Sequence, residues 1–105
     1  MLQGMAVDGS KVGALRISLQ IRAEGLKNGD TQFERPSLMV HFYDSERKPA
    51  GTEMIGPWFG TFDWKPVKSS ITVPSKAREA VLRIGLNGAT GSLSVDDLRL
   101  TPEPR

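Results

Sequence analysis

Residues Gly91–Pro102 read GSLSVDDLRLTP, the pattern of a β-strand that is interrupted in its middle. The apolar positions of this stretch are Leu93, Val95, Leu98 and Leu100. Aspartate is depleted in strands, and adjacent carboxylates repel one another. Because Val95 and Leu98 are three residues apart, a regular strand cannot turn both towards one core. A β-bulge at Asp96 and Asp97 would let both face inward, so the pair predicts a bulged strand.

Three further runs alternate apolar and polar residues with a period of two, which is typical of strands with one buried face. These runs are residues 14–24, 36–44 and 80–88. Another strand is expected at Val67–Val73, a weaker one at Glu53–Phe59, and a helical turn at most at Ser75–Val81. The glycine-bounded segment Asn87–Gly91 predicts a hairpin between the last two strands. Short antiparallel strands separated by turns predict an all-β sandwich or barrel.

Length and composition bound the protein class. The 105 residues predict one domain over 1–105, with residues 1–13 and 102–105 irregular. The net charge is +2, and the basic residues are scattered, so no run favours nucleic acid. No apolar run approaches the ~20 residues of a membrane helix. The absence of cysteine excludes disulfides, thiolate metal sites and a cysteine nucleophile.

Catalytic patterns are missing from the sequence. His41 is the single histidine and has no G-x-S-x-G elbow nearby. No phosphate-binding glycine motif occurs, and no spacing pairs two carboxyl groups as glycoside hydrolysis requires. The sequence therefore predicts a protein that is not an enzyme.

The order of features in the C-terminal part resembles carbohydrate-binding modules of the galactose-binding-like jelly-roll superfamily. These features are Thr61-Phe62-Asp63-Trp64, a strand ending at Val73-Pro74, the strand Ala80–Gly88, and Gly91–Leu100 with its Asp pair. The resemblance covers roughly Ala14–Leu100 and implies a mostly antiparallel β-sandwich jelly roll, often attached to a glycoside hydrolase or another cell-surface enzyme. Such modules commonly have strands before the one placed at Ala14. Here either the sandwich is reduced or the N-terminal strands are cut away.

The resemblance also assigns roles to single residues. An aspartate at the position of Asp96 or Asp97 helps such modules to hold a structural calcium, a cation that takes six to eight oxygen ligands. The alternative for this pair is a bulge without metal. Trp64 matches a tryptophan that those modules use for packing.

Aromatic side chains in loops can stack on the flat faces of sugars. Trp58 lies between Gly56-Pro57 and Gly60 and is the first candidate for stacking, with burial in the core as its alternative. Phe33 is a weaker candidate of the same kind.

The polar positions of the alternating runs offer a second set of candidates. If the apolar positions face the core, one opposite face carries Arg16, Gln20, Arg22, Met39, His41, Tyr43, Arg83 and Asn87. This face could bind a glycan, and its arginines would favour acidic or sulfated sugars. The alternative is an ordinary solvated sheet face.

These observations together predict a non-catalytic module that binds polysaccharide or oligosaccharide and belongs to a larger secreted, extracellular or periplasmic protein with a fused catalytic domain. The expected binding residues are Trp58, Tyr43, His41, Arg16, Arg22, Arg83 and Asn87. One structural calcium at Asp96 and Asp97 is the single cofactor considered, and neither nucleic acid nor membrane is an expected partner. A structural module that packs against a catalytic partner domain is the alternative function. Polyanion binding through Arg16, Arg22 and Arg83 is a third.

Overall fold

The computed structural model describes residues 2–27, 36–85 and 90–105, and the regular structure in these ranges is β-strand alone. The strands in chain order are β1 (Leu2–Ala6), β2 (Val12–Lys27), β3 (Ser37–Tyr43), β4 (Pro49–Ile55), β5 (Gly60–Thr72), β6 (Glu79–Gly85) and β7 (Thr90–Pro104). The described residues include no helix long and apolar enough to cross a membrane. The predicted all-β fold is confirmed.

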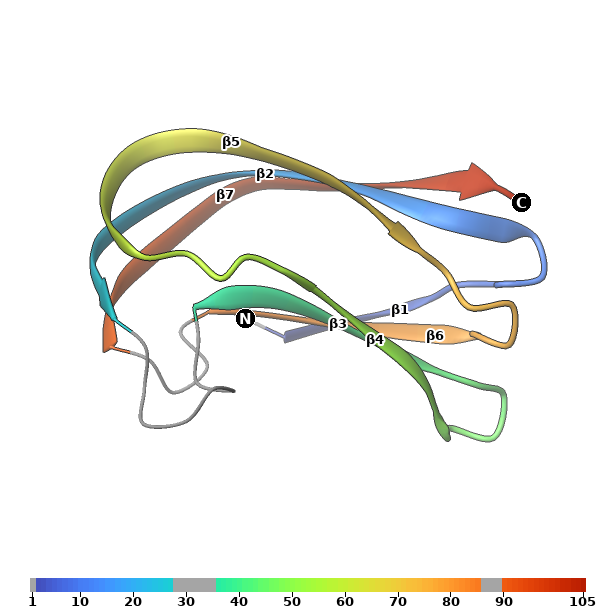
Figure 1. Cartoon of the computed structure of the whole chain (residues 1–105). Helices are drawn as coiled ribbons and strands as arrows, with labels where there is room; N and C mark the ends of the chain where they lie inside the picture. The colour runs from blue at the N-terminus through green and yellow to red at the C-terminus, as the bar shows by residue number, and fades with distance from the viewer. Residues whose placement is uncertain (1, 28–35, 86–89) are drawn as a thin grey trace.

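The strands form two sheets that pack face to face (Figure 1). One sheet has four strands in the order β1-β6-β3-β4, and the other has three in the order β5-β2-β7. Each neighbouring pair in both sheets is antiparallel. The molecule measures 41 × 27 × 17 Å, and its short dimension is that of two stacked sheets. The chain is therefore the predicted β-sandwich of jelly-roll type.

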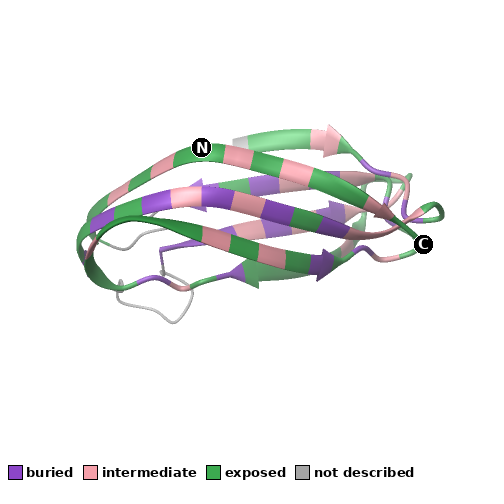
Figure 2. Cartoon of the chain, turned by 90° about the horizontal axis from the view of Figure 1, so that it is seen from above, coloured by how far each residue is buried: buried purple, intermediate pink, exposed green. Residues whose placement is uncertain are grey.

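The period-two runs place their apolar residues between the two sheets, as the alternating burial along the strands in Figure 2 shows. The side chains of β2 that are buried there are Leu15, Ile17, Leu19 and Ile21. They pack against the buried residues of β3 and β6, which include Leu38, Val40, Phe42, Leu82 and Ile84. Burying a side chain of this size contributes about 1.5–3 kcal/mol, so burial fixes which face of each strand is inward.

The predicted bulge lies at the Asp pair. Ser18 pairs with Arg99 and Gln20 with Asp96, so the single residue between them on β2 faces two residues of β7, Asp97 and Leu98. Asp97 has a left-handed backbone with φ 53°, a conformation that aspartate adopts more readily than most residues. As a result, Val95 and Leu98 both pack against the core.

The two chain ends are more regular than the sequence predicted. Residues 1–13 contain β1, which pairs with β6, and residues 102–104 continue β7. The prolines of β7 are tolerated because this strand lies at an edge of its sheet, where a missing N–H costs no ladder bond. Arg105 follows β7, and its guanidinium donates hydrogen bonds to the carbonyl oxygens of Gly9 and Val73. The prediction of irregular ends is therefore wrong.

Three local predictions also need correction. The last two strands do not form a hairpin, because β6 and β7 belong to different sheets. The segment Ser75–Val81 forms a turn and then enters β6, with the Arg78 N–H donating to the Tyr43 carbonyl oxygen at 2.8 Å, in place of a helical turn. The strand expected at Glu53–Phe59 is β4, which begins at Pro49 and ends at Ile55. Period alone does not reveal which strand is the neighbour of which.

Candidate functional site

A groove runs along β2 on the outer face of the three-stranded sheet. Two of its depressions, of about 460 and about 270 Å³, adjoin each other and share Ser18 and Lys68. A third, of about 260 Å³, lies further along β2 at Arg22 and Glu24. The polar residues that line these depressions are Arg16, Ser18, Gln20, Arg22, Glu24, Lys68, Ser69, Ser70, Ser92, Ser94, Asp97, Arg99 and Thr101. We call this surface the β2 groove.

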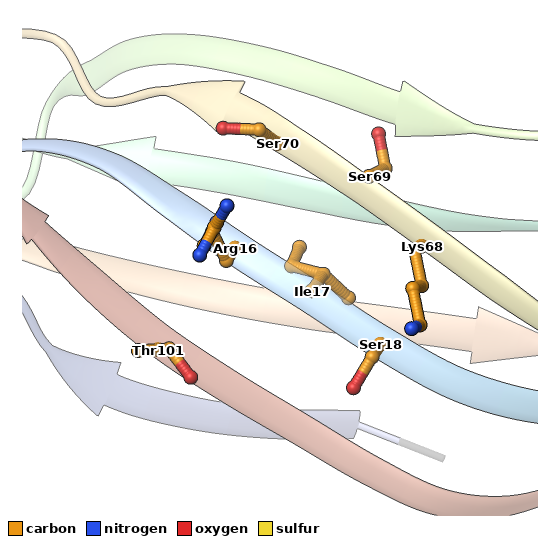
Figure 3. Close-up of a pocket in the computed structure, with 7 residues that line it drawn as sticks. All are labelled: Arg16, Ile17, Ser18, Lys68, Ser69, Ser70 and Thr101. Carbon is orange, nitrogen blue, oxygen red and sulfur yellow. The ribbon is translucent and has the colours of Figure 1, made fainter.

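The strand register explains why these side chains lie together. Alternation along β2 turns Arg16, Ser18 and Gln20 away from the core, and no layer of the described chain covers this face. Each of them has a neighbour on β5 and another on β7; Ser18, for example, pairs with Lys68 and with Arg99. Figure 3 shows such side chains from all three strands around the 460 Å³ depression. The site is thus built from strand residues on a rigid sheet.

The arginines of the β2 groove have carboxylate partners. The Arg16 Nε–Glu103 Oε1 distance is 2.6 Å, and the Arg99 Nε–Asp97 Oδ1 distance is 2.9 Å. Arg22 lies 3.5 Å from Glu24, with a longer contact of 3.9 Å to Asp63. Among the described residues, Lys68 has no such partner. Because each guanidinium is compensated, the groove carries donors and acceptors side by side and little net charge.

An exposed tryptophan of β5 lies opposite Arg22 of the β2 groove. Lys65 pairs with Ile21 and Phe62 with Ala23, so β5 places two residues, Asp63 and Trp64, opposite Arg22. Trp64 is 47% exposed at this second bulge. The prediction that Trp64 serves packing is wrong, because an added residue in β5 changes which side chains reach the core.

Trp58, which was predicted to stack on a sugar, is buried. It is 8% exposed and belongs to the core, and its backbone N–H donates to the Pro36 carbonyl oxygen at 2.9 Å. A ring buried in this way has no free face for a sugar, so the prediction that Trp58 stacks on a ligand is wrong. The preceding loop folds the tryptophan back over the sandwich, which Gly56 allows through its φ of 116°. Phe33 lies outside the described residues.

The predicted glycan platform is divided between two faces. Arg16 and Arg22 lie on the β2 groove, whereas His41, Tyr43 and Arg83 lie on the outer face of the four-stranded sheet. His41 Nδ1 is 3.3 Å from Thr52 Oγ1 on β4. Asn87 lies outside the described residues. The prediction of one shared platform is wrong because alternation tells inside from outside, but not one sheet from the other.

The groove residues that sequence reasoning missed come mainly from β5 and β7. Lys68, Ser70, Arg99 and Thr101 have the outward parity of their strands, and this parity is visible in the sequence. Only the pairing of both strands with β2 turns that parity into a shared surface. Within β2 itself, Ser18 was passed over because a small hydroxyl gives no signal of its own.

The Asp pair is occupied by contacts within the chain. Asp97 Oδ1 accepts a hydrogen bond from Arg99 Nε, and Asp96 Oδ1 accepts one from the Asp97 N–H at 2.8 Å. The described residues contain no group of three or more His, Asp or Glu side chains that could hold a metal ion. Two carboxylates beside a guanidinium are a poor match for the six to eight oxygens of calcium. Calcium at this pair stays a prediction.

The fold and the open groove define the chain as a jelly-roll β-sandwich with an uncovered polar face. No protein-family model and no curated protein sequence matches the chain. A solved structure described as "CBM4 structure and function", a carbohydrate-binding module, has the same fold with a TM-score of 0.62 at 14% sequence identity. The match covers 97% of this chain and 59% of that one, so this chain spans little more than half of the solved module's length.

Proposed function

We propose that the chain is a non-catalytic module that binds a polysaccharide along the β2 groove. The observation that carries this proposal is the groove itself, a row of hydroxyl, amide and paired charged groups along β2, with the exposed Trp64 opposite Arg22. The fold shared with a carbohydrate-binding module supports it.

The chemistry of the groove suits sugar hydroxyls, which both donate and accept hydrogen bonds. An arginine paired with a carboxylate offers its remaining N–H donors next to the carboxylate's free acceptor positions. Trp64 offers a flat apolar face for the C–H groups of a sugar ring. From Arg16 to Arg22 the strand extends over about 20 Å, which suits an extended oligosaccharide better than one sugar.

The charge pattern favours a neutral glycan over an acidic one. The sequence suggested acidic or sulfated sugars because three arginines were expected on one face. The two of them on the groove, Arg16 and Arg22, are each compensated by glutamate, and Arg83 lies on the opposite face. Among the described groove residues, Lys68 is then a cation without a carboxylate partner. One such cation gives only weak support for polyanion binding.

Affinity electrophoresis through gels that contain neutral or acidic polysaccharides tests the proposal. We expect a neutral polysaccharide to retard the chain, and Trp64→Ala to weaken that retardation by about tenfold or more in dissociation constant. The matched control is Phe59→Ala, which removes an aromatic ring that is 53% exposed and precedes β5, whereas Trp64 lies within β5 opposite Arg22. Equal retardation of the wild type and the Trp64 variant would exclude stacking on Trp64, and retardation by no neutral polysaccharide would refute the groove as a site for neutral glycans.

We also propose that the module belongs to a larger secreted protein, extracellular or periplasmic, and holds a catalytic domain near its polysaccharide. The support is the polar groove on a domain whose fold is shared with a carbohydrate-binding module. The alternative is a structural module that packs on the catalytic domain. Retardation by no polysaccharide, with loss of the parent enzyme's activity on deletion of the module, would favour that alternative.

A further inference from the structure

The outer face of the four-stranded sheet carries two charges, Glu79 and Arg83, without an ion-pair partner in the described part of the chain. Glu79 and Arg83 lie on β6, two residues to either side of Val81, and all three have the outward parity of that strand. Among the described residues neither charge has an ion-pair partner, in contrast to the arginines of the β2 groove. Two opposite charges on either side of an apolar centre form a pattern that is complementary to a second copy of itself.

The register extends this pattern across the sheet in three rows. In the central row Val81 has Gly4 on one side and His41 and Thr52 on the other. The row of Arg83 continues into Met39 and Met54, and Met54 is 45% exposed. The row of Glu79 continues into Tyr43, with Ala6 on its other side. One outer row is therefore cationic with methionines, and the other is anionic with an aromatic ring.

We propose that a second copy of the chain docks on this face with two-fold symmetry. A two-fold axis that lies in the plane of the interface and runs along the Val81 row places this row of one copy over the same row of the other. It then places the Arg83 row of each copy over the Glu79 row of the other. Arg83 meets Glu79 of the second copy, and Met39 meets Tyr43 of the second copy, a favourable contact between sulfur and an aromatic ring.

The strand directions of two sheets packed face to face differ by about 30°, and the Arg83 and Glu79 side chains are long enough to keep their contact at that angle. Four strands and five residues give a flat area of about 300 Å² per copy. Because stable interfaces bury about 800 Å² per partner, the dimer is weak and its formation depends on concentration. It leaves both β2 grooves uncovered, so the inference does not rest on the proposed function.

Sedimentation equilibrium of the intact chain, from about 10 μM to about 1 mM, tests the dimer. We expect the weight-average mass to rise from 11.5 kDa towards twice that value, and less steeply at high salt. Arg83→Glu and Glu79→Arg should each lower the association constant by about tenfold or more, because like charges then face each other.

The decisive experiment mixes the two single variants. An equimolar mixture of the Arg83→Glu and Glu79→Arg chains restores opposite charges at both contacts, and so does the double variant. Lys11→Glu, a charge reversal of the same size in the exposed turn before β2, should leave association unchanged. A monomeric wild type over the whole range, or a mixture that associates no better than its components, would overturn the proposal. Circular dichroism of each variant identifies loss of folding as a separate cause.

Discussion

The bulge at Asp97 makes a sharp prediction about single substitutions. A left-handed conformation costs a non-glycine residue about 1–2 kcal/mol, and a β-branched side chain tolerates it worst. Asp97→Val also removes the pair with Arg99, whose side chain is 72% exposed and whose pairing contributes at most about 1 kcal/mol. We therefore expect this variant to lose about 2 kcal/mol in free energy of unfolding.

Asp97→Gly and Asp96→Val are the matched comparisons. Glycine relieves the strained φ, and this gain offsets the lost ion pair and the extra backbone entropy of about 0.5–1 kcal/mol, so its stability should stay close to that of the wild type. Asp96 lies outward, has no positive φ, and should tolerate valine at a cost below about 1 kcal/mol. Urea unfolding measures all three. Equal losses for valine at both positions would show that the left-handed bulge does not exist.

Three further predictions concern acid stability, the core and metal. The pKa values of Asp8 and Asp44 are lowered from the ordinary 3.8, chiefly by hydrogen bonds from the Ser10 side chain and from the Lys48 N–H. The stabilisation by each ionised carboxylate is thus complete above pH 3.8 and is lost as the pH falls through the lowered pKa of the folded state. In Asp8→Asn and in Asp44→Asn, the urea concentration at half-unfolding should therefore fall less steeply between about pH 5 and pH 2 than in the wild type. Trp58→Ala should cost about 3–5 kcal/mol in the same assay, whereas Trp64→Ala stays within about 0.5, and the reverse order would contradict their exposures. If calcium binds at the Asp pair, a chelator lowers the melting temperature and Asp96→Ala abolishes that effect. A melting temperature that the chelator does not change would leave the bulge as the only role of the pair.

The sequence predicted the parts of the fold that depend on burial. Alternation identified β2, β3 and β6 and named their inward residues, because an apolar side chain gains the same free energy in any sandwich of this kind. The spacing of Val95 and Leu98 predicted the bulge for the same reason. What alternation does not contain is the neighbour of each strand, so Arg16 and Arg83 were grouped on one face although they lie on opposite ones.

The two tryptophans show the second limit. Their residue type predicts that each is either buried or available for binding, and the choice depends on backbone geometry several residues away. An added residue in β5 turns Trp64 outward, and a loop entering β5 folds Trp58 inward. Bulges and loop paths follow from the pairing of distant strands, which a single sequence read in short windows does not reveal.

The bulge at the Asp pair also bears on whether the edge of its sheet can pair with strands of other molecules at high concentration. β7 and β5 are the two open edges of the described three-stranded sheet, and open edges recruit strands from other molecules. β7 is kinked at Asp97 and ends in prolines, while β5 is bulged at Trp64 and carries Pro66. Neither edge of this sheet offers a long, regular and uncharged ladder, so both edges disfavour pairing with a strand of another molecule.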